Sequence, residues 1–76
     1  MLEVKILAPG GFLFTGKADH VILPGEQGVF EVLPFHRPLL TRLLAGVIRV
    51  DGKSLPIERG AVRVERNTVT AVVNPA

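Results

Sequence analysis

The sequence contains no cysteine, tryptophan or tyrosine, and its 76 residues include only four phenylalanines. Without cysteine the chain has no disulfide framework, no thiolate metal site and no cysteine nucleophile, which suits a reducing compartment. Its uninterrupted apolar stretches are only a few residues long, so a transmembrane helix and direct membrane insertion are not expected. The first residues alternate in polarity instead of placing a basic segment before an apolar one, so no signal peptide is expected.

A strong excess of either charge is also missing. Nine Lys and Arg residues oppose seven Asp and Glu residues, and the formal net charge is +2. The basic residues are interleaved with acidic ones, so no stripe that could track a phosphate backbone is visible, and nucleic acid is not an expected partner. The hydrophobic share of 47% is too high for a disordered chain. The length leaves room for one domain, and we expect residues 1–76 to form it.

The apolar residues that are present favour strands. Eleven Val, ten Leu and four Ile residues dominate the hydrophobic share, and branched side chains suit a pleated sheet. Residues 2–8 alternate in polarity with a period of two, and residues 17–23 and 28–33 form further strand candidates between Gly and Pro residues. Seven or more short strands separated by such turns are typical of a β-sandwich or β-barrel.

Two hairpins can be tested by their register. A two-residue type I′ turn at Asp51-Gly52 would place Ile48 opposite Leu55 and separate an apolar face from one that holds Arg49 and Ser54. A turn at 66–67 would likewise place Val64 opposite Val69, Val62 opposite Ala71 and Arg63 opposite Thr70. The segment 38–45 is ambiguous, because Leu39, Leu40, Leu43 and Leu44 fit a short helix as well as an extended segment.

The candidates for chemistry are few. Ser54 follows a predicted turn on the outward face, and neighbouring residues Asp19 and His20 would point to opposite faces of a strand. The glycines lack the spacing of a phosphate-binding loop, and the two histidines lack the spacing of a zinc site. We therefore expect no catalytic, cofactor-binding or metal-binding residues, and no binding of ATP.

The four phenylalanines divide into two groups. Phe12 and Phe14 are predicted to share one face of a short strand, and Phe30 follows strand alternation, so at least two of these rings should be in the core. Phe35 lies between Pro34 and His36 in a turn-rich segment, where it is either a loop anchor or part of a contact surface.

Residues 24–41, which read PGEQGVFEVLPFHRPLLT, resemble the signature of the epsilon subunit of F-type rotary ATP synthases. In that family the second half of this segment typically reads PGHAPLLT. The resemblance extends to the FTG at 14–16, to the GVIR at 46–49 and to the closing residues 64–70, and covers roughly residues 2–73.

The resemblance implies an all-β fold, a flattened β-sandwich of about ten short strands with no C-terminal helical hairpin in this chain, and an extended segment at 38–44. It also implies a non-catalytic rotor subunit at the foot of the central stalk of a proton-translocating ATP synthase, where the domain couples the gamma subunit to the c-ring. The expected location is peripheral, on the cytoplasmic face of the cell membrane as part of the complex. Family members commonly continue past the position of Ala76 into a two-helix arm, whose functions are not assigned to these residues.

The resemblance also suggests which residues touch a partner. We assign contact with the c-ring or gamma subunit to Gly28, Val29, Phe35, His36 and Arg37. Phe35 stands where the family usually has Gly, and Arg37 where it usually has Ala, so the surface should be bulkier and more basic here. Val29 occupies a position that is often acidic. An alternative function is a free-standing small β module that binds a peptide or sugar through the loops at 24–38.

Overall fold

The computed structural model describes all 76 residues and contains eight strands, with no helix long and apolar enough to cross a membrane. The strands are β1 Leu2–Ala8, β2 Gly11–Ala18, β3 Val21–Gly25, β4 Gly28–Val32, β5 Leu39–Leu43, β6 Gly46–Val50, β7 Lys53–Glu65 and β8 Thr68–Pro75.

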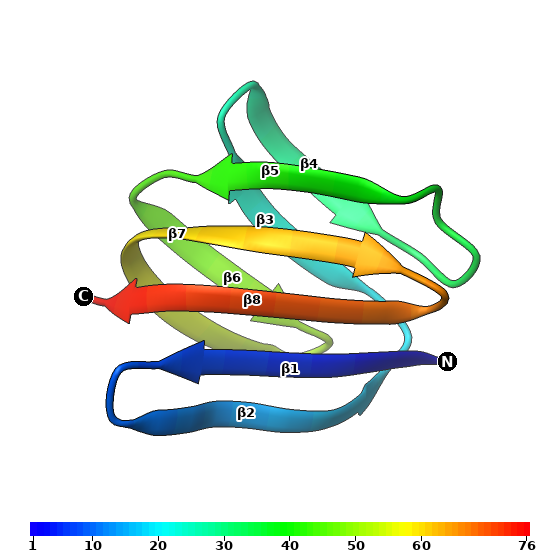
Figure 1. Ribbon diagram of the computed structural model, residues 1–76, viewed down its shortest axis with the longest axis horizontal. Helices are drawn as coiled ribbons and strands as arrows, with labels where there is room; N and C mark the ends of the chain where they lie inside the picture. The colour runs from blue at the N-terminus through cyan, green and yellow to red at the C-terminus, as the bar shows by residue number, and fades with distance from the viewer.

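The strands form the two layers of a flattened sandwich (Figure 1). One layer has the order β2-β1-β8-β7-β5, in which β1 and β8 are parallel and the other neighbours are antiparallel. The second layer contains β4, β3 and β6, and β6 pairs with the first part of β7. The strand β7 therefore belongs to both layers, with an irregularity in its pairing between Ile57 and Arg59 where it passes from one to the other. The all-β sandwich is confirmed.

The structure has eight strands instead of the roughly ten that the family resemblance implies. One reason is that two hairpin arms, predicted as separate strands, form a single strand. The arm after the 51–52 turn and the arm before the 66–67 turn are joined as β7, which is 13 residues long. A bulge lets a strand bend without ending its hydrogen-bond ladder. This continuity fastens the layers to each other through the backbone.

The registers predicted for both hairpins are confirmed. Ile48 pairs with Leu55, and Val64 pairs with Val69. The 66–67 turn has a positive φ at both central residues, as a type I′ turn requires. The type I′ prediction is wrong for the 51–52 turn, where only Asp51 is left-handed, with a φ of 51°. A positive φ at the first central residue alone is the pattern of a type II′ turn. Because the loop still has two residues, the register of the hairpin is unchanged.

Sixteen buried apolar residues fill the space between the layers, and no polar or charged residue is buried. The predicted alternation of the first strand is confirmed, because Leu2, Val4 and Ile6 are all buried. The other core members are Ala18, Val21, Leu23, Val32, Leu43, Ile48, Val50, Ile57, Val62, Val64, Val69, Ala71 and Val73.

The ambiguous segment 38–45 is extended. Strand β5 pairs with β7 from Leu39 to Leu43, so its backbone groups are hydrogen-bonded in the sheet instead of in a helical turn. Leu43 is buried and Leu40 is exposed, as strand geometry requires for residues at odd spacing. The extended segment that the family resemblance implies is confirmed.

The predicted strand at 17–23 is interrupted at Asp19 and His20, which form the loop between β2 and β3. The Asp51 carboxylate accepts hydrogen bonds from the backbone N–H of Asp19, at 3.1 Å, and from that of His20, at 3.2 Å. These two N–H groups therefore bond to a side chain 31 and 32 residues away and not to a neighbouring strand. A side chain that is distant in sequence breaks the strand, which local alternation cannot reveal.

The prediction that Phe12 and Phe14 share a face is wrong. Phe14 lies opposite Ile6 and Phe12 lies opposite Leu7, so Leu13 is an extra residue in β2. Because neighbouring residues of β1 point to opposite faces, the bulge sends the two rings to opposite faces as well. Phe14 packs against the core together with Phe30, whereas Phe12 is 62% exposed.

Candidate partner-contact site

The loop between β4 and β5 is organised by a tight turn. The N–H of His36 donates to the carbonyl oxygen of Leu33 at 3.1 Å, which closes a four-residue turn with Pro34 and Phe35 at its centre. Phe35 has a φ of 66°. Proline followed by a left-handed residue is the pattern of a type II turn, whose second central position favours glycine. The family's usual glycine at this position thus has a physical reason, and Phe35 departs from it.

The ring of Phe35 is 87% exposed. Phe35 therefore does not anchor the loop to the core, and its contact with a partner stays a prediction. Arg37 is also exposed, and His36 is partly exposed. The His36 Nδ1 lies 2.7 Å from the backbone carbonyl oxygen of Arg37, so this nitrogen carries the proton and donates. The loop thus presents an aromatic ring and a guanidinium to solvent from a hydrogen-bonded backbone.

Gly28 and Val29 lie at the start of β4, directly after the turn that joins it to β3. Gly28 has a φ of 119°, which L-residues rarely adopt, and Val29 is 74% exposed. These two residues and His36 line one shallow hollow with Leu39 and Thr41 of β5. The structure thus gathers three of the five predicted contact residues around this hollow, and Phe35 and Arg37 are not part of its lining.

Asn67 is a residue of this site that the sequence reasoning missed. It lies in the turn between β7 and β8, and its side-chain oxygen Oδ1 accepts a hydrogen bond from the N–H of Phe35 at 2.5 Å. Asparagine is a common residue in a left-handed turn position, and Asn67 has a φ of 60°. The turn alone accounts for this residue, so nothing in the sequence pointed to a second role.

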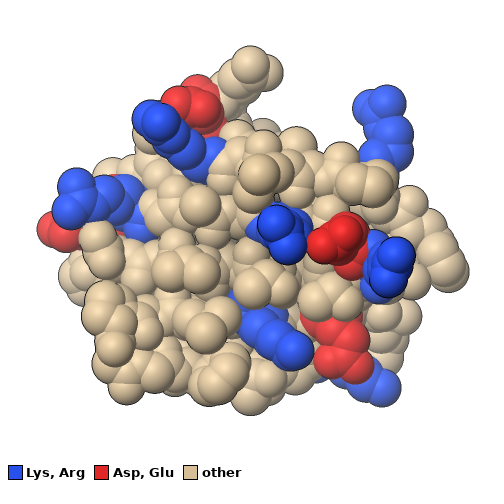
Figure 2. Space-filling model, in the orientation of Figure 1, with Lys and Arg blue, Asp and Glu red and all other residues tan.

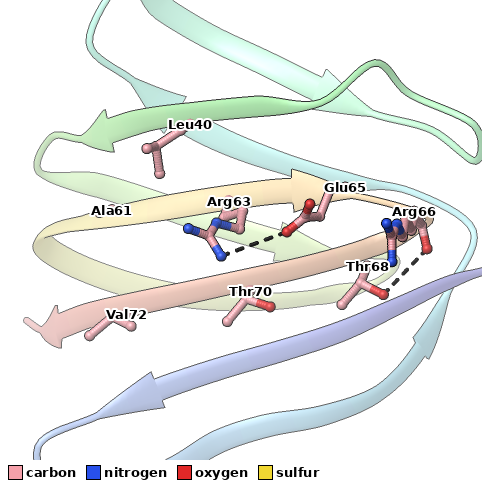
Figure 3. Close-up of a pocket in the computed structure, with 8 residues that line it drawn as sticks. All are labelled: Leu40, Ala61, Arg63, Glu65, Arg66, Thr68, Thr70 and Val72. Atoms are coloured by element: carbon pink, nitrogen blue, oxygen red, sulfur yellow. Dashed lines mark hydrogen bonds and ion pairs between the residues drawn. The ribbon is translucent and has the colours of Figure 1, made fainter.

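A second exposed area lies on the outer face of the β5-β7-β8 sheet (Figure 3). In the middle of its lining, Arg63 Nη1 lies 3.6 Å from Glu65 Oε1, while Leu40, Ala61 and Val72 supply apolar surface. The remaining lining residues are Arg66, Thr68 and Thr70. The sequence did not predict this hollow, because its residues come from three strands whose order depends on the tertiary fold.

The strand registers extend this area into an apolar row. Phe12 lies opposite Leu7, Leu7 opposite Val72, and Val72 opposite Ala61, so these four side chains cross the sheet from β2 to β7. Val72 is 58% exposed. Charged side chains of both signs are dispersed over this side of the molecule and are sparse toward the turn between β1 and β2 (Figure 2).

Ser54 and His20, the polar residues that the sequence offered as candidates for catalysis, lie outside these two exposed areas. Ser54 Oγ accepts a hydrogen bond from Arg49 Nη1 at 3.2 Å on the outward face of the β6-β7 hairpin. His20 Nδ1 lies 3.5 Å from Oδ1 of Asp51, so the carboxylate near this imidazole is not that of its neighbour Asp19. No group of three or more His, Cys, Asp or Glu side chains is placed to hold a metal ion.

The fold and these surfaces define a small β-sandwich domain with an apolar interior and exposed apolar groups on a tight loop and one sheet face. Comparison of the sequence with known protein families assigns this domain to one of them. The chain belongs to the family described as the ATP synthase delta/epsilon chain β-sandwich domain, whose family model matches residues 1–76.

Individual relatives agree with this assignment. The chain is 44% identical to the ATP synthase epsilon chain of a Nitratiruptor species over 99% of its length, and 38% identical to that of Rippkaea orientalis over the same share. It spans 62% and 58% of these two relatives. A solved structure of the central stalk and c-ring of Tetrahymena thermophila mitochondrial ATP synthase contains a similar fold, with a TM-score of 0.77. That match has 18% identity and covers 96% of this chain and 63% of the other.

Proposed function

We propose that this domain is a non-catalytic rotor component of a proton-translocating F-type ATP synthase, and that it couples the gamma subunit to the c-ring in the central stalk. The observation that carries the proposal is the family match over residues 1–76. In this function the domain transmits torque as a stiff wedge between two partners, and it lies peripherally on the cytoplasmic face of the membrane.

The construction of the domain suits a mechanical part. Its interior holds sixteen apolar residues and no buried polar or charged side chain. Close-packed interiors have low compressibility and transmit strain. Because β7 runs through both layers, a force on one layer reaches the other through continuous backbone as well as through packing.

A coupling element between two partners needs two contact surfaces, and the structure offers two exposed areas that include apolar side chains. One is the loop side with Gly28, Val29, Phe35, His36 and Arg37, which we assign to the c-ring or gamma subunit. The other is the apolar row on the outer face of the sheet that contains β8. Exposed apolar groups of this kind are typical of protein interaction sites.

The test is association with the partners. The domain should be retained on an immobilised complex of gamma subunit and c-ring, and Phe35→Ala should weaken this association by more than about 1 kcal/mol, roughly the effect of losing a buried interface aromatic. The thermal midpoint of the isolated domain should hardly change, because the ring is 87% exposed. Val47→Ala, on the outward face of β6, is the matched control and should bind normally.

Two results would contradict the proposal. The first is no retention of the parent chain on either partner, combined with saturable binding to a peptide or sugar through the loops at 24–38. The second result would contradict only the assignment of the contact residues. It is a fall of many degrees in the thermal midpoint of the Phe35→Ala domain, while the fraction that remains folded binds the partners normally.

A further inference from the structure

We propose that Asn67 is a positioning residue for partner binding, which holds Phe35 in the conformation that presents its ring. This inference rests on the proposed function, because it assumes that Phe35 meets a partner. The hydrogen bond from the Phe35 N–H to the Asn67 side chain joins two segments that are 32 residues apart. It is the only hydrogen bond between the β4-β5 loop and the β7-β8 turn.

Asn67 is itself well anchored. Its carbonyl oxygen accepts a hydrogen bond from the N–H of Glu3 at 2.8 Å, which ties the turn to the start of β1. Its left-handed φ belongs to a hairpin whose flanking strands pair in register through Val64 and Val69. The acceptor offered to Phe35 is therefore fixed to β1, β7 and β8, the centre of one layer.

Phe35 needs such an anchor. A bulky residue at a φ of 66° is strained, and strained residues persist only where their surroundings over-determine them. The ring cannot supply that restraint, because it is 87% exposed. The restraints that the structure provides are the turn bond between His36 and Leu33, the proline on the N-terminal side, and the bond to Asn67.

The consequence for binding follows from geometry. If the Asn67 acceptor is removed, the exposed Phe35 N–H can bond to water, and the residue is free to relax to a negative φ. That rotation redirects the ring relative to the sandwich. A partner then has to restore the left-handed conformation when it binds, and this ordering lowers the affinity.

The test uses replacements that keep the β7-β8 turn intact. Asn67→Gly removes the acceptor and tolerates the left-handed φ, whereas Asn67→Asp keeps an acceptor at the same place. Arg66→Gly is the control, because it alters the neighbouring left-handed position without touching the bond to Phe35. The intraresidue nuclear Overhauser effect between the amide and Hα protons of Phe35, which is strong only at a left-handed φ, reports the conformation of the isolated domain.

We expect Asn67→Gly to weaken that signal, to speed exchange of the Phe35 amide severalfold, and to reduce affinity for the gamma and c-ring complex severalfold. Asn67→Asp and Arg66→Gly should leave the Phe35 signal as in the parent, and Asn67→Asp should also retain the parent affinity. In the Phe35→Ala background, Asn67→Gly should reduce affinity no further, because the two residues act through one contact.

Two outcomes would overturn the inference. One is an unchanged Phe35 signal in Asn67→Gly, and the other is an equal loss of affinity from Asn67→Gly in the parent and Phe35→Ala backgrounds. Failure of the proposed function has a different signature, since the parent chain would then not bind the complex at all while the Phe35 signal of Asn67→Gly still changed.

Discussion

At the scale of single residues, adjacent positions on a strand differ sharply in burial. Ile48 is fully buried in the core, while its neighbour Arg49 is exposed and donates a hydrogen bond to Ser54. The pairing of Ile48 with Leu55 and of Arg49 with Ser54 places these contacts on opposite faces of one hairpin. A change at one position should therefore cost far more free energy of unfolding than a change at the next.

Ile48→Ala should lower the free energy of unfolding by about 2–4 kcal/mol, through lost transfer free energy and the cavity that remains. That is a large part of the total for a domain of this size, which is roughly 5 kcal/mol. Arg49→Ala should change it by less than about 0.5 kcal/mol. Urea denaturation of both variants measures the difference, and equal shifts of the midpoint would mean that the inward and outward faces are assigned wrongly.

At the scale of elements, the passage of β7 between the layers depends on a close approach at Gly60. A Cβ atom there would lie 2.6 Å from the carbonyl oxygen of Val72 and 2.8 Å from a methyl carbon of Val73. Gly60 pairs with Leu43 of β5 on one side and with Val73 of β8 on the other. Because backbone on both sides is held in ladders, the strand has little freedom to move away.

Gly60→Ala should therefore reduce the free energy of unfolding by about 1–3 kcal/mol, the usual range for overpacking. Gly10→Ala is the matched control, since nothing lies within 4 Å of the position its Cβ would take. Thermal denaturation of the two variants provides the comparison. A Gly60→Ala domain as stable as the Gly10→Ala domain would show that the strands can separate at this point without cost.

At the scale of the whole molecule, the two layers share one core and one strand. The core residues come from both layers, and β7 contributes Ile57 where it pairs with β6 and Val62 where it pairs with β5. Neither layer can lose its partner without exposing the apolar face of the other. The domain should consequently unfold as a single cooperative unit.

Native-state hydrogen exchange tests this cooperativity. The slowest amides of β1 in one layer and of β3 in the other should exchange with the same free energy, equal to that of global unfolding. Heating should give coincident transitions by far-UV circular dichroism and calorimetry. A layer whose amides open at a clearly lower free energy would contradict the view of the sandwich as one stiff wedge.

Several features of the fold and site were predictable because their causes are local. The period-two pattern of Leu2, Val4 and Ile6 and the two-residue hairpins need only neighbouring residues to specify them. The family segment at 24–41 includes the loop that carries Phe35. It did not decide whether the ring is buried, because a single apolar residue between prolines fits either environment.

The sequence by itself determined the all-β class, the registers of both long hairpins and the inward residues of their strands, since alternation and loop length act over a few residues. Only the tertiary structure decided the break at Asp19 and His20, the outward turn of Phe12 and the hydrogen bond from the Phe35 N–H to the Asn67 side chain. Two of these depend on a side chain 31 or 32 residues away, and the third depends on the strand opposite. Such contacts exist only once the layers have assembled, because hydrogen-bond partners and bulges are set by what packs alongside and not by local preference.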